Sequence, residues 1–484
     1  MAVFQWTGSA STGDFSTAGN WLPAAGAPPG PNDLAKIEGA AVPITGTGNP
    51  EILYTSGTVK LAGHFTETYG SPVNAQQLTL LPGAVLTTPM VHFVVGIDSP
   101  PPMIGNMTVG EGSAVVIAGS HTPNNYAIEM SELAGSNSSL VVEGAGAVVN
   151  GGNLPMSVGQ AGPSLLTIRN GGVVSVGNAD PLIYPWCLVI GNHPGSSGTV
   201  QVQRASLLGH GEIIVGRNST GTLNVDEGGL VVAEDLAIGW EPTNQQNSPP
   251  TEGIGAVTVK GRDARLIVDN QLEVQHMGTG SLTVADHGFV SAGVGVVVNG
   301  TLSLANGVID TLALGVNTGA TLSGNGTVIA AQGVDNNGGV ITAVGKLIFV
   351  GDVDNAPIAH GSSMTVAADS ELQVFGALTD DGALSLHADS VASLEAVASG
   401  QTVSFDGAHA RLVLRSPGEF AGSISNFGKT HKIVLEADVT NVAFANGVLT
   451  ATGPGGPVAE LQMMGSYEPP NFLLAPGFPG VITV

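Results

Sequence analysis

Acidic residues are the side chains of this sequence that most readily suggest catalysis. Pairs of carboxylates about 5–10 Å apart cleave glycosidic bonds, one acting as an acid and the other as a base or nucleophile. The candidates are Asp226, Glu227, Glu234, Asp235, Asp263 and Asp269. The competing interpretation is a set of turns, because Asp and Gly favour turns and outer charges keep strand edges from pairing. We expect turns and no reaction chemistry, with a polysaccharide-cleaving enzyme as the alternative.

Two other acidic stretches suggest a metal site only weakly. "GDVDNA", from Gly351 to Ala356, and "TDDG", from Thr379 to Gly382, carry oxygen ligands of the kind that calcium prefers. Neither stretch has the full spacing of a calcium loop, so we expect turns, with structural calcium as the alternative and no other cofactor. His193 lies near Cys187, but no further ligand joins them, so the sequence predicts no zinc site.

Cys187, in "YPWCLVI", is the single cysteine and has no partner for an internal disulfide. A free cysteine among apolar neighbours usually behaves as a small buried hydrophobic side chain. No recognisable His–Cys motif accompanies it. We therefore interpret Cys187 as a core residue, with a thiol nucleophile as the weaker alternative.

Trp6, Phe15 and Trp21 lie in a stretch rich in Pro and Gly, in a chain whose aromatic content is 5%. We expect them to plug one end of the fold, because exposed end strands are templates for unwanted pairing. The alternative is that Trp6 and Trp21 form a platform on which a glycan stacks.

Composition limits the class of protein. The chain has 484 residues, 71 glycines, 43% hydrophobic residues and a formal net charge of −25. This apolar content argues against disorder, and the absence of a three-residue glycine period excludes collagen. The negative charge argues against nucleic acid and anionic membranes as partners. No segment has the length of a transmembrane helix, and the first residues do not resemble a signal peptide.

The candidate residues lie within a sequence repeat, so the fold of that repeat decides their positions. Leu166, Val200, Leu223, Val257 and Leu282 mark successive copies, at spacings of 34, 23, 34 and 25 residues. Each copy has a strand ending in Ile/Val-Gly, a polar loop, a second strand, a turn with Gly, and a third strand. The apolar residues alternate with a period of two, which predicts strands. In "GTLNVDEGGLVVAEDLAIG", we expect Leu223, Val225 and Val232 to face inward.

Such a unit cannot bury its inner face alone, whereas stacked copies bury a continuous core. The sequence therefore predicts an all-β fold, a parallel β-solenoid or β-helix. The alternative is a series of β-sandwiches, but sandwich strands do not repeat one signature at coil spacing. We predict an N-terminal cap over 1–61, the repeat solenoid over 62–400 and a β-rich C-terminal capping or assembly module over 401–484.

The pattern L-x-I-G-x-x-x-x-G-T-L-x-V-x-x-G-G-x-L-x-V resembles the passenger-associated repeats of bacterial autotransporter-type and related secreted surface proteins. The copies at 189–202, 215–232 and 238–259 fit it best. The segment 324–353 is similar to the end of such passengers, and the first and last parts of the chain also resemble this class. The resemblance implies a secreted or cell-surface structural role, as in adhesion, matrix or filament. One departure is that no aromatic-rich translocator barrel is expected in this chain.

The function we expect is that of an extracellular or cell-surface structural or adhesive protein, and not an enzyme. The alternative is a polysaccharide-binding or polysaccharide-cleaving β-helix. The closing strand, Val481, Ile482, Thr483 and Val484, could add to the next copy and give head-to-tail fibres of a biofilm matrix. The expected partners are therefore further copies of the chain, other surface or matrix components, or glycans, with no nucleic acid and no membrane insertion.

Overall fold

The computed structural model describes residues 1–23, 26–69, 71–93, 104–118, 126–177, 186–240, 252–356, 361–467, 472–475 and 480–484. They divide into two compact units. Unit 1 comprises Met1–Asp269 with Gln275–Ser281, and unit 2 comprises Asn270–Val274 with Leu282–Val484. Each unit is built from parallel, in-register strands, which confirms the predicted β-solenoid. No helix among the described residues has the length and apolarity needed to cross a membrane.

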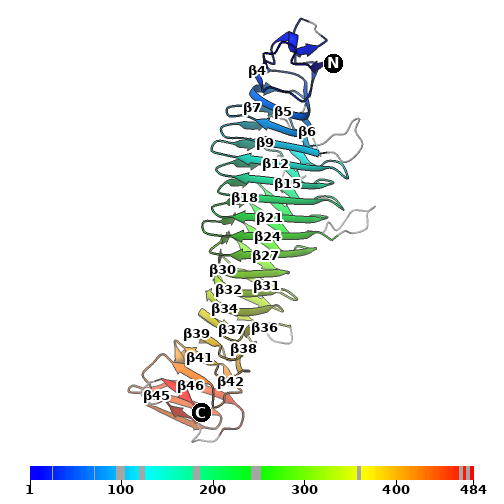
Figure 1. Ribbon diagram of the computed structural model, residues 1–484. Helices are drawn as coiled ribbons and strands as arrows, with labels where there is room; N and C mark the ends of the chain where they lie inside the picture. The colour runs from blue at the N-terminus through cyan, green and yellow to red at the C-terminus, as the bar shows by residue number, and fades with distance from the viewer. Residues whose placement is uncertain are drawn as a thin grey trace. The chain divides into compact units, whose positions relative to one another are not determined.

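Three walls of parallel strands form the body of unit 1 (Figure 1). The first wall contains β5 (Ile52–Thr66), β6 (Ser71–Leu80), β9 (Ile104–Val109), β12 (Asn137–Glu143), β15 (Pro163–Arg169), β18 (Ser197–Gln203), β21 (Thr220–Asp226) and β24 (Ile254–Lys260). The second wall contains β7 (Val85–Thr88), β10 (Ala114–Ile117), β13 (Val148–Asn150), β16 (Val173–Val176), β19 (Ser206–Gly209), β22 (Leu230–Ala233) and β25 (Arg265–Val268). The third wall contains β8 (Val91–Phe93), β11 (Ile128–Met130), β14 (Met156–Val158), β17 (Trp186–Ile190), β20 (Glu212–Val215) and β23 (Asp235–Ile238).

The inward residues of unit 1 follow the predicted period of two. Leu223 and Val225 are fully buried and align with inward residues of the strands before and after them. Val232 does not face inward as predicted, because Val231 and Ala233 fill the interior instead. The reason is that the alternation continues without a shift through the turn, where Gly229 is itself buried.

Glycine is required where the third wall turns toward the first. Gly191 and Gly216 have φ angles of +73° and +75°. A Cβ at Gly216 would lie 2.3 Å from the carbonyl oxygen of Ile254 in the next coil. Backbone conformation and close approach therefore both exclude a side chain at this corner.

The head of unit 1 has an aromatic interior. It contains β1 (Ala2–Trp6), η1 (Ala18–Asn20), β2 (Trp21–Leu22), β3 (Asp33–Glu38) and β4 (Ile44–Gly48). Trp21 packs edge-to-face on Trp6 and Phe15, with ring centroids 5.0 and 4.8 Å apart, and its indole N–H donates to the Phe15 carbonyl. Trp6 is 8% exposed and Trp21 is 1% exposed, so neither ring presents the open face that a stacked sugar needs. This burial does not favour the glycan platform at Trp6 and Trp21. The platform and the plug both stay predictions.

Unit 2 contains long strands, each of which bends and contributes its two halves to two different walls of the coil. The long strands are β30 (Thr301–Thr311), β32 (Thr321–Ala330), β34 (Val340–Val350) and β37 (Glu371–Thr379). The short strands between them are β31 (Leu314–Asn317), β33 (Val334–Asn337), β35 (Val353–Asn355) and β36 (Ser363–Val366). The remaining elements up to Leu435 are β26 (Gln271–Val274), β27 (Thr279–Ala285), β28 (Phe289–Ala292), β29 (Gly295–Val298), β38 (Ala383–Leu386), β39 (Val391–Val397), β40 (Thr402–Phe405), β41 (Arg411–Leu414), η3 (Pro417–Glu419), β42 (Ser423–Ser425) and β43 (Lys432–Leu435). The first three residues of β27 belong to unit 1.

A ladder of amides lies inside unit 2. Asn336 donates to the side-chain oxygen of Asn355 at 2.9 Å, and Asn355 donates to that of Gln401 at 3.3 Å. Gln401 donates in turn to the carbonyls of Asn355 and Thr379. Because all three side chains are fully buried, these hydrogen bonds offset the cost of placing amides in the core.

Parallel pairing continues through both predicted domain boundaries. β5 crosses residue 61, and the stacking of β38, β40 and β42 crosses residue 400. The coil therefore extends to β43. The elements that follow, which make antiparallel pairings, are β44 (Asn441–Ala445), β45 (Val448–Gly453), β46 (Gly456–Met464), β47 (Leu473–Leu474) and β48 (Val481–Thr483). β46 also stacks in parallel on β42.

The closing strand is already paired within the chain. β48 pairs with β43 along one edge and with β47 along the other, and Ile482 is fully buried. Strand addition to another copy requires an open edge. Both edges of β48 are therefore occupied within the chain, and the assembly site at Val481, Ile482, Thr483 and Val484 stays a prediction that requires one of these pairings to open.

Candidate functional site

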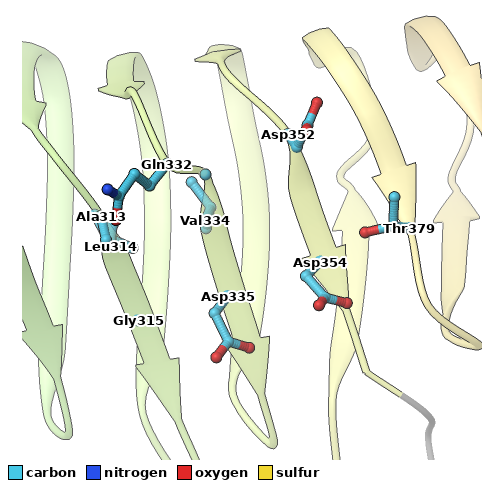
Figure 2. A pocket seen from close by; sticks show the side chains of 10 residues that line it. Ala313, Leu314, Gly315, Gln332, Val334, Asp335, Asp352, Asp354 and Thr379 are labelled. Carbon is cyan, nitrogen blue, oxygen red and sulfur yellow. The ribbon is translucent and has the colours of Figure 1, made fainter.

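An acidic groove of about 430 Å³ lies on the outer surface of unit 2 (Figure 2). Its floor is a register ladder, in which Gly315 of β31 aligns with Asp335 of β33, Asp354 of β35 and Thr379 of β37. Gly315 has no side chain, which leaves space in the groove at the β31 end of this row. Strand alternation sends these four positions outward, while Asn336 and Asn355 face the core.

The two floor carboxylates are close neighbours. Figure 2 shows Asp335 and Asp354 on the same face of adjacent strands. Neighbouring strands lie about 4.8 Å apart, which places two negative charges side by side. Asp380 follows Thr379 at the end of β37 and adds a third carboxylate nearby.

This arrangement raises the pKa of Asp354 above its ordinary value. The largest cause is partial burial of the carboxyl group, and the charges of Asp380 and Asp335 act in the same direction. Desolvation and like charges both disfavour the ionised form. The groove thus contains a carboxyl group that holds its proton to a higher pH than an isolated aspartate does.

The rim of the groove is formed at a corner of the coil. Gln332 lies at the turn before β33, and Asp352 at the turn before β35. One carboxylate oxygen of Asp352 accepts a hydrogen bond from the Ala377 amide at 2.8 Å, which fixes this side chain. The groove therefore offers carboxylates, an amide and a hydroxyl group to a polar ligand, a chemistry suited to sugar hydroxyls.

Sequence reasoning found the parts of this groove but not their combination. The stretches 351–356 and 379–382, proposed as weak calcium ligands, are brought together there, and Asp335 was missed. The signal was the outward Asp at in-register positions of successive coils. Within the described residues, no group of three or more His, Cys, Asp or Glu side chains is placed to hold a metal ion. Structural calcium stays a prediction.

The acids predicted in unit 1 lie at two corners of the coil, one on each side of β22. Glu227 and Asp263 share the first corner, and Asp269 lies in the coil next to Glu234 at the second, where its amide donates to the Ala233 carbonyl. Asp226 lies at the end of β21 and Asp235 at the start of β23, with β22 between them. The four residues of β22 span about 13 Å, which exceeds the separation that a carboxylate pair needs. Asp226 instead aligns with Gln203 and Lys260 of the neighbouring coils.

Cys187 is a core residue, as predicted. Its side chain is fully buried, and burial raises the pKa of the thiol to about 12. Nucleophilic cysteines have the opposite property, a lowered pKa and partial exposure. The exposed His193 lies in the turn after β17 and shares no metal cluster with Cys187 among the described residues.

Comparison with solved structures finds distant neighbours, one of which is described here. The chain matches no protein-family model and has no significant match to a curated protein. It is similar to the crystal structure of a TibA fragment, residues 55–350, that is hyper-glycosylated by TibC. The two share 12% sequence identity over 78% of this chain and 97% of that chain, with a TM-score of 0.24. So low a score carries no argument about function, and the resemblance to passenger repeats stays a prediction.

Proposed function

We propose that this chain is an extracellular or cell-surface structural protein with an adhesive role. The observation that carries the proposal is that inward positions repeat whereas outward positions vary. The inward positions of four successive coils are Leu166, Val200, Leu223 and Val257, and the outward positions beside them are Thr167, Gln201, Asn224 and Thr258. A wall of this kind keeps its core while its outer surface is free to adapt to a partner.

Surface display tests this proposal directly. Non-adherent bacteria displaying the chain should gain cell–cell aggregation or adhesion to a polysaccharide-coated surface. A matched variant, Val225→Asp, places a charge in the core and should abolish the gain because the wall unfolds. Display of intact protein with no gain in aggregation, adhesion or retention in a matrix would contradict the adhesive role.

Cleavage of a polysaccharide is a second candidate, favoured by the groove of unit 2. Asp354, with its raised pKa, is suited to act as a general acid, and the adjacent Asp335 as a base or nucleophile. Asp354→Asn and Asp335→Asn should each lower the release of reducing ends from the substrate by at least about 100-fold. Asp310→Asn, at an outward position of β30, serves as the matched control. Equal release by all four proteins would eliminate this candidate.

A further inference from the structure

One line of residues in unit 1 occupies the same position in successive coils. Each of β14, β17, β20 and β23 is followed by a glycine with positive φ and then by one variable residue. These variable residues, named here the corner line, are Gln160, Asn192, Arg217 and Trp240. The amide of Asn192 donates to the Gly159 carbonyl at 2.9 Å, that of Arg217 to Gly191 at 3.0 Å, and that of Trp240 to Gly216 at 2.8 Å.

The corner line is held in place by its own side chains. Arg217 donates to the side-chain oxygen of Asn192 at 3.1 Å, and the Asn192 amide group donates to that of Gln160 at 2.6 Å. The Arg217 guanidinium lies 4.3 Å from the ring centroid of Trp186 and 5.7 Å from that of Trp240. Four coils therefore contribute to one ordered row of amides, a guanidinium and an indole.

An apolar floor underlies this polar row. Val189 of β17 and Ile214 of β20 face outward yet are fully buried, because they pack with Trp186, and Trp240 packs partly against them. The rings of Trp186 and Trp240 meet edge-to-face at 5.9 Å, and His276 meets Trp240 in the same way at 5.6 Å. An apolar floor with a few fixed polar groups is the usual anatomy of a ligand site.

The line remains partly open to ligand. Gln160, Arg217 and Trp240 are half-buried, and the neighbouring His193 is exposed. The ring nitrogen of His193 lies 3.3 Å from the Gln160 amide nitrogen, which extends the row of polar groups to the surface. The backbone N–H groups of Asn192, Arg217 and Trp240 already pair with the preceding coil, so an extended peptide could not add here as a strand. Recognition at this line must use side chains.

We propose that the corner line binds an extended glycan that runs across successive coils, with Trp240 stacking on a sugar ring and Gln160 and Arg217 binding hydroxyl or carboxylate oxygens. Indole faces stack on apolar surfaces, whereas amides and guanidinium form directional hydrogen bonds with oxygen. The coils advance by about 4.8 Å each, so binding groups recur along the line at the scale of a sugar ring. This inference deepens the proposed adhesive role and rests on it for its biological meaning.

The test uses the purified full chain on an array of neutral and uronic-acid polysaccharides, followed by titration with the strongest binder. Trp240→Ala and Arg217→Gln should each weaken binding at least tenfold, and Arg217→Gln should do so most for uronic-acid glycans. Trp6→Phe, in the buried head, is the matched control and should bind as the parent does. Thermal melting establishes that each variant is folded.

If Trp240→Ala fails to fold, glycan binding can instead be followed by indole fluorescence of the parent chain and of the more conservative Trp240→Phe. Glycan should change the emission of the parent chain, and the conservative Trp240→Phe should remove most of that change. Absence of binding to all glycans by the parent chain, or equal binding by Trp240→Phe, Arg217→Gln and the parent, would overturn the proposal. Adhesion of displaying cells without glycan binding by the purified chain would reject the corner line alone. Glycan binding without adhesion would reject the adhesive role instead.

Discussion

The corner line of unit 1 and the acidic groove of unit 2 use the same in-register geometry to opposite electrostatic effect. In the corner line, Asn192 bridges Gln160 and Arg217, so each group stabilises the next. In the groove, Asp335 and Asp354 repel each other, and the pKa of Asp354 is raised. A solenoid places every residue beside its counterpart in the next coil. The outward residues therefore decide whether a row forms a hydrogen-bonded network or a set of mutually repelling charges.

Breaking a corner of unit 1 should have the largest effect. Gly216→Ala puts a Cβ against the Ile254 backbone and should cost more than about 4 kcal/mol of stability or prevent folding. Gly195→Ala is the matched control, since Gly195 has a φ of +80° but nothing within 4 Å of a Cβ. It should cost about 1 kcal/mol from backbone strain alone. Urea unfolding would measure both, and equal losses would show that close approach between coils is unimportant.

The interior amide ladder of unit 2 offers the next test. Asn355→Ala removes the partner of both Asn336 and Gln401 and should cost about 2–3 kcal/mol, since buried amides lose their hydrogen bonds. Asn337→Ala, at an exposed position of β33, should cost less than about 0.5 kcal/mol. Chemical denaturation would measure the free energy of unfolding of both variants. A small loss for Asn355→Ala would mean that the ladder does not stabilise unit 2.

Repulsion between the carboxylates of the groove can be reduced by a single conservative substitution. Asp380→Asn removes one of the charges that raise the pKa of Asp354 and should shift that pKa downward, as measured by NMR titration. Because the folded-state pKa is raised, Asp354 favours folding at low pH, and this contribution is lost as pH rises from about 3.8 through the folded-state pKa. Asp380→Asn should therefore slightly stabilise the chain at neutral pH. An unchanged titration would refute the stacked-carboxylate description.

Ion pairs between coils should have the smallest effect in either unit. Arg169 contacts Glu143 at 2.5 Å in unit 1, and Lys346 contacts Glu371 at 3.4 Å in unit 2. All four side chains are partly exposed, so Arg169→Ala and Lys346→Ala should each cost less than about 1 kcal/mol. The loss should be larger for Arg169, which makes a second contact with Glu143 through Nε. Thermal melts at low and high salt would measure both, and a loss above 2 kcal/mol would contradict this ranking.

The repeat in the sequence was sufficient to predict the solenoid, because its period of two and its glycines are local signals. Leu223 and Val225 face inward as expected, whereas Val232 does not. The number of residues in the turn decides whether odd-numbered or even-numbered positions face inward in the next strand. The pairing of β48 was not predictable, because its partner β43 lies far away in the sequence. Burial of Trp21 depends likewise on Phe15, whose ring also packs on the distant Phe65.

The candidate sites were harder to predict than the wall. Asp335 and Asp354 are 19 residues apart in the sequence and become neighbours only through coil register. The corner line was visible as the variable residue after each Ile/Val-Gly, but its members differ chemically, so no motif connects them. Register is thus the property that converts scattered residues into sites.

Cysteine cross-linking within unit 1 tests this register most directly. Gln201 and Asn224 are aligned, outward-facing positions of β18 and β21, and the native Cys187 is buried and does not interfere. Aligned Cα atoms about 4.8 Å apart are within disulfide range, whereas a shift by two residues gives about 8 Å. We expect Gln201→Cys with Asn224→Cys to form a disulfide under mild oxidation, and Gln201→Cys with Thr222→Cys not to form one. Preferential cross-linking of the second pair would contradict the in-register wall of unit 1, on which the corner line depends.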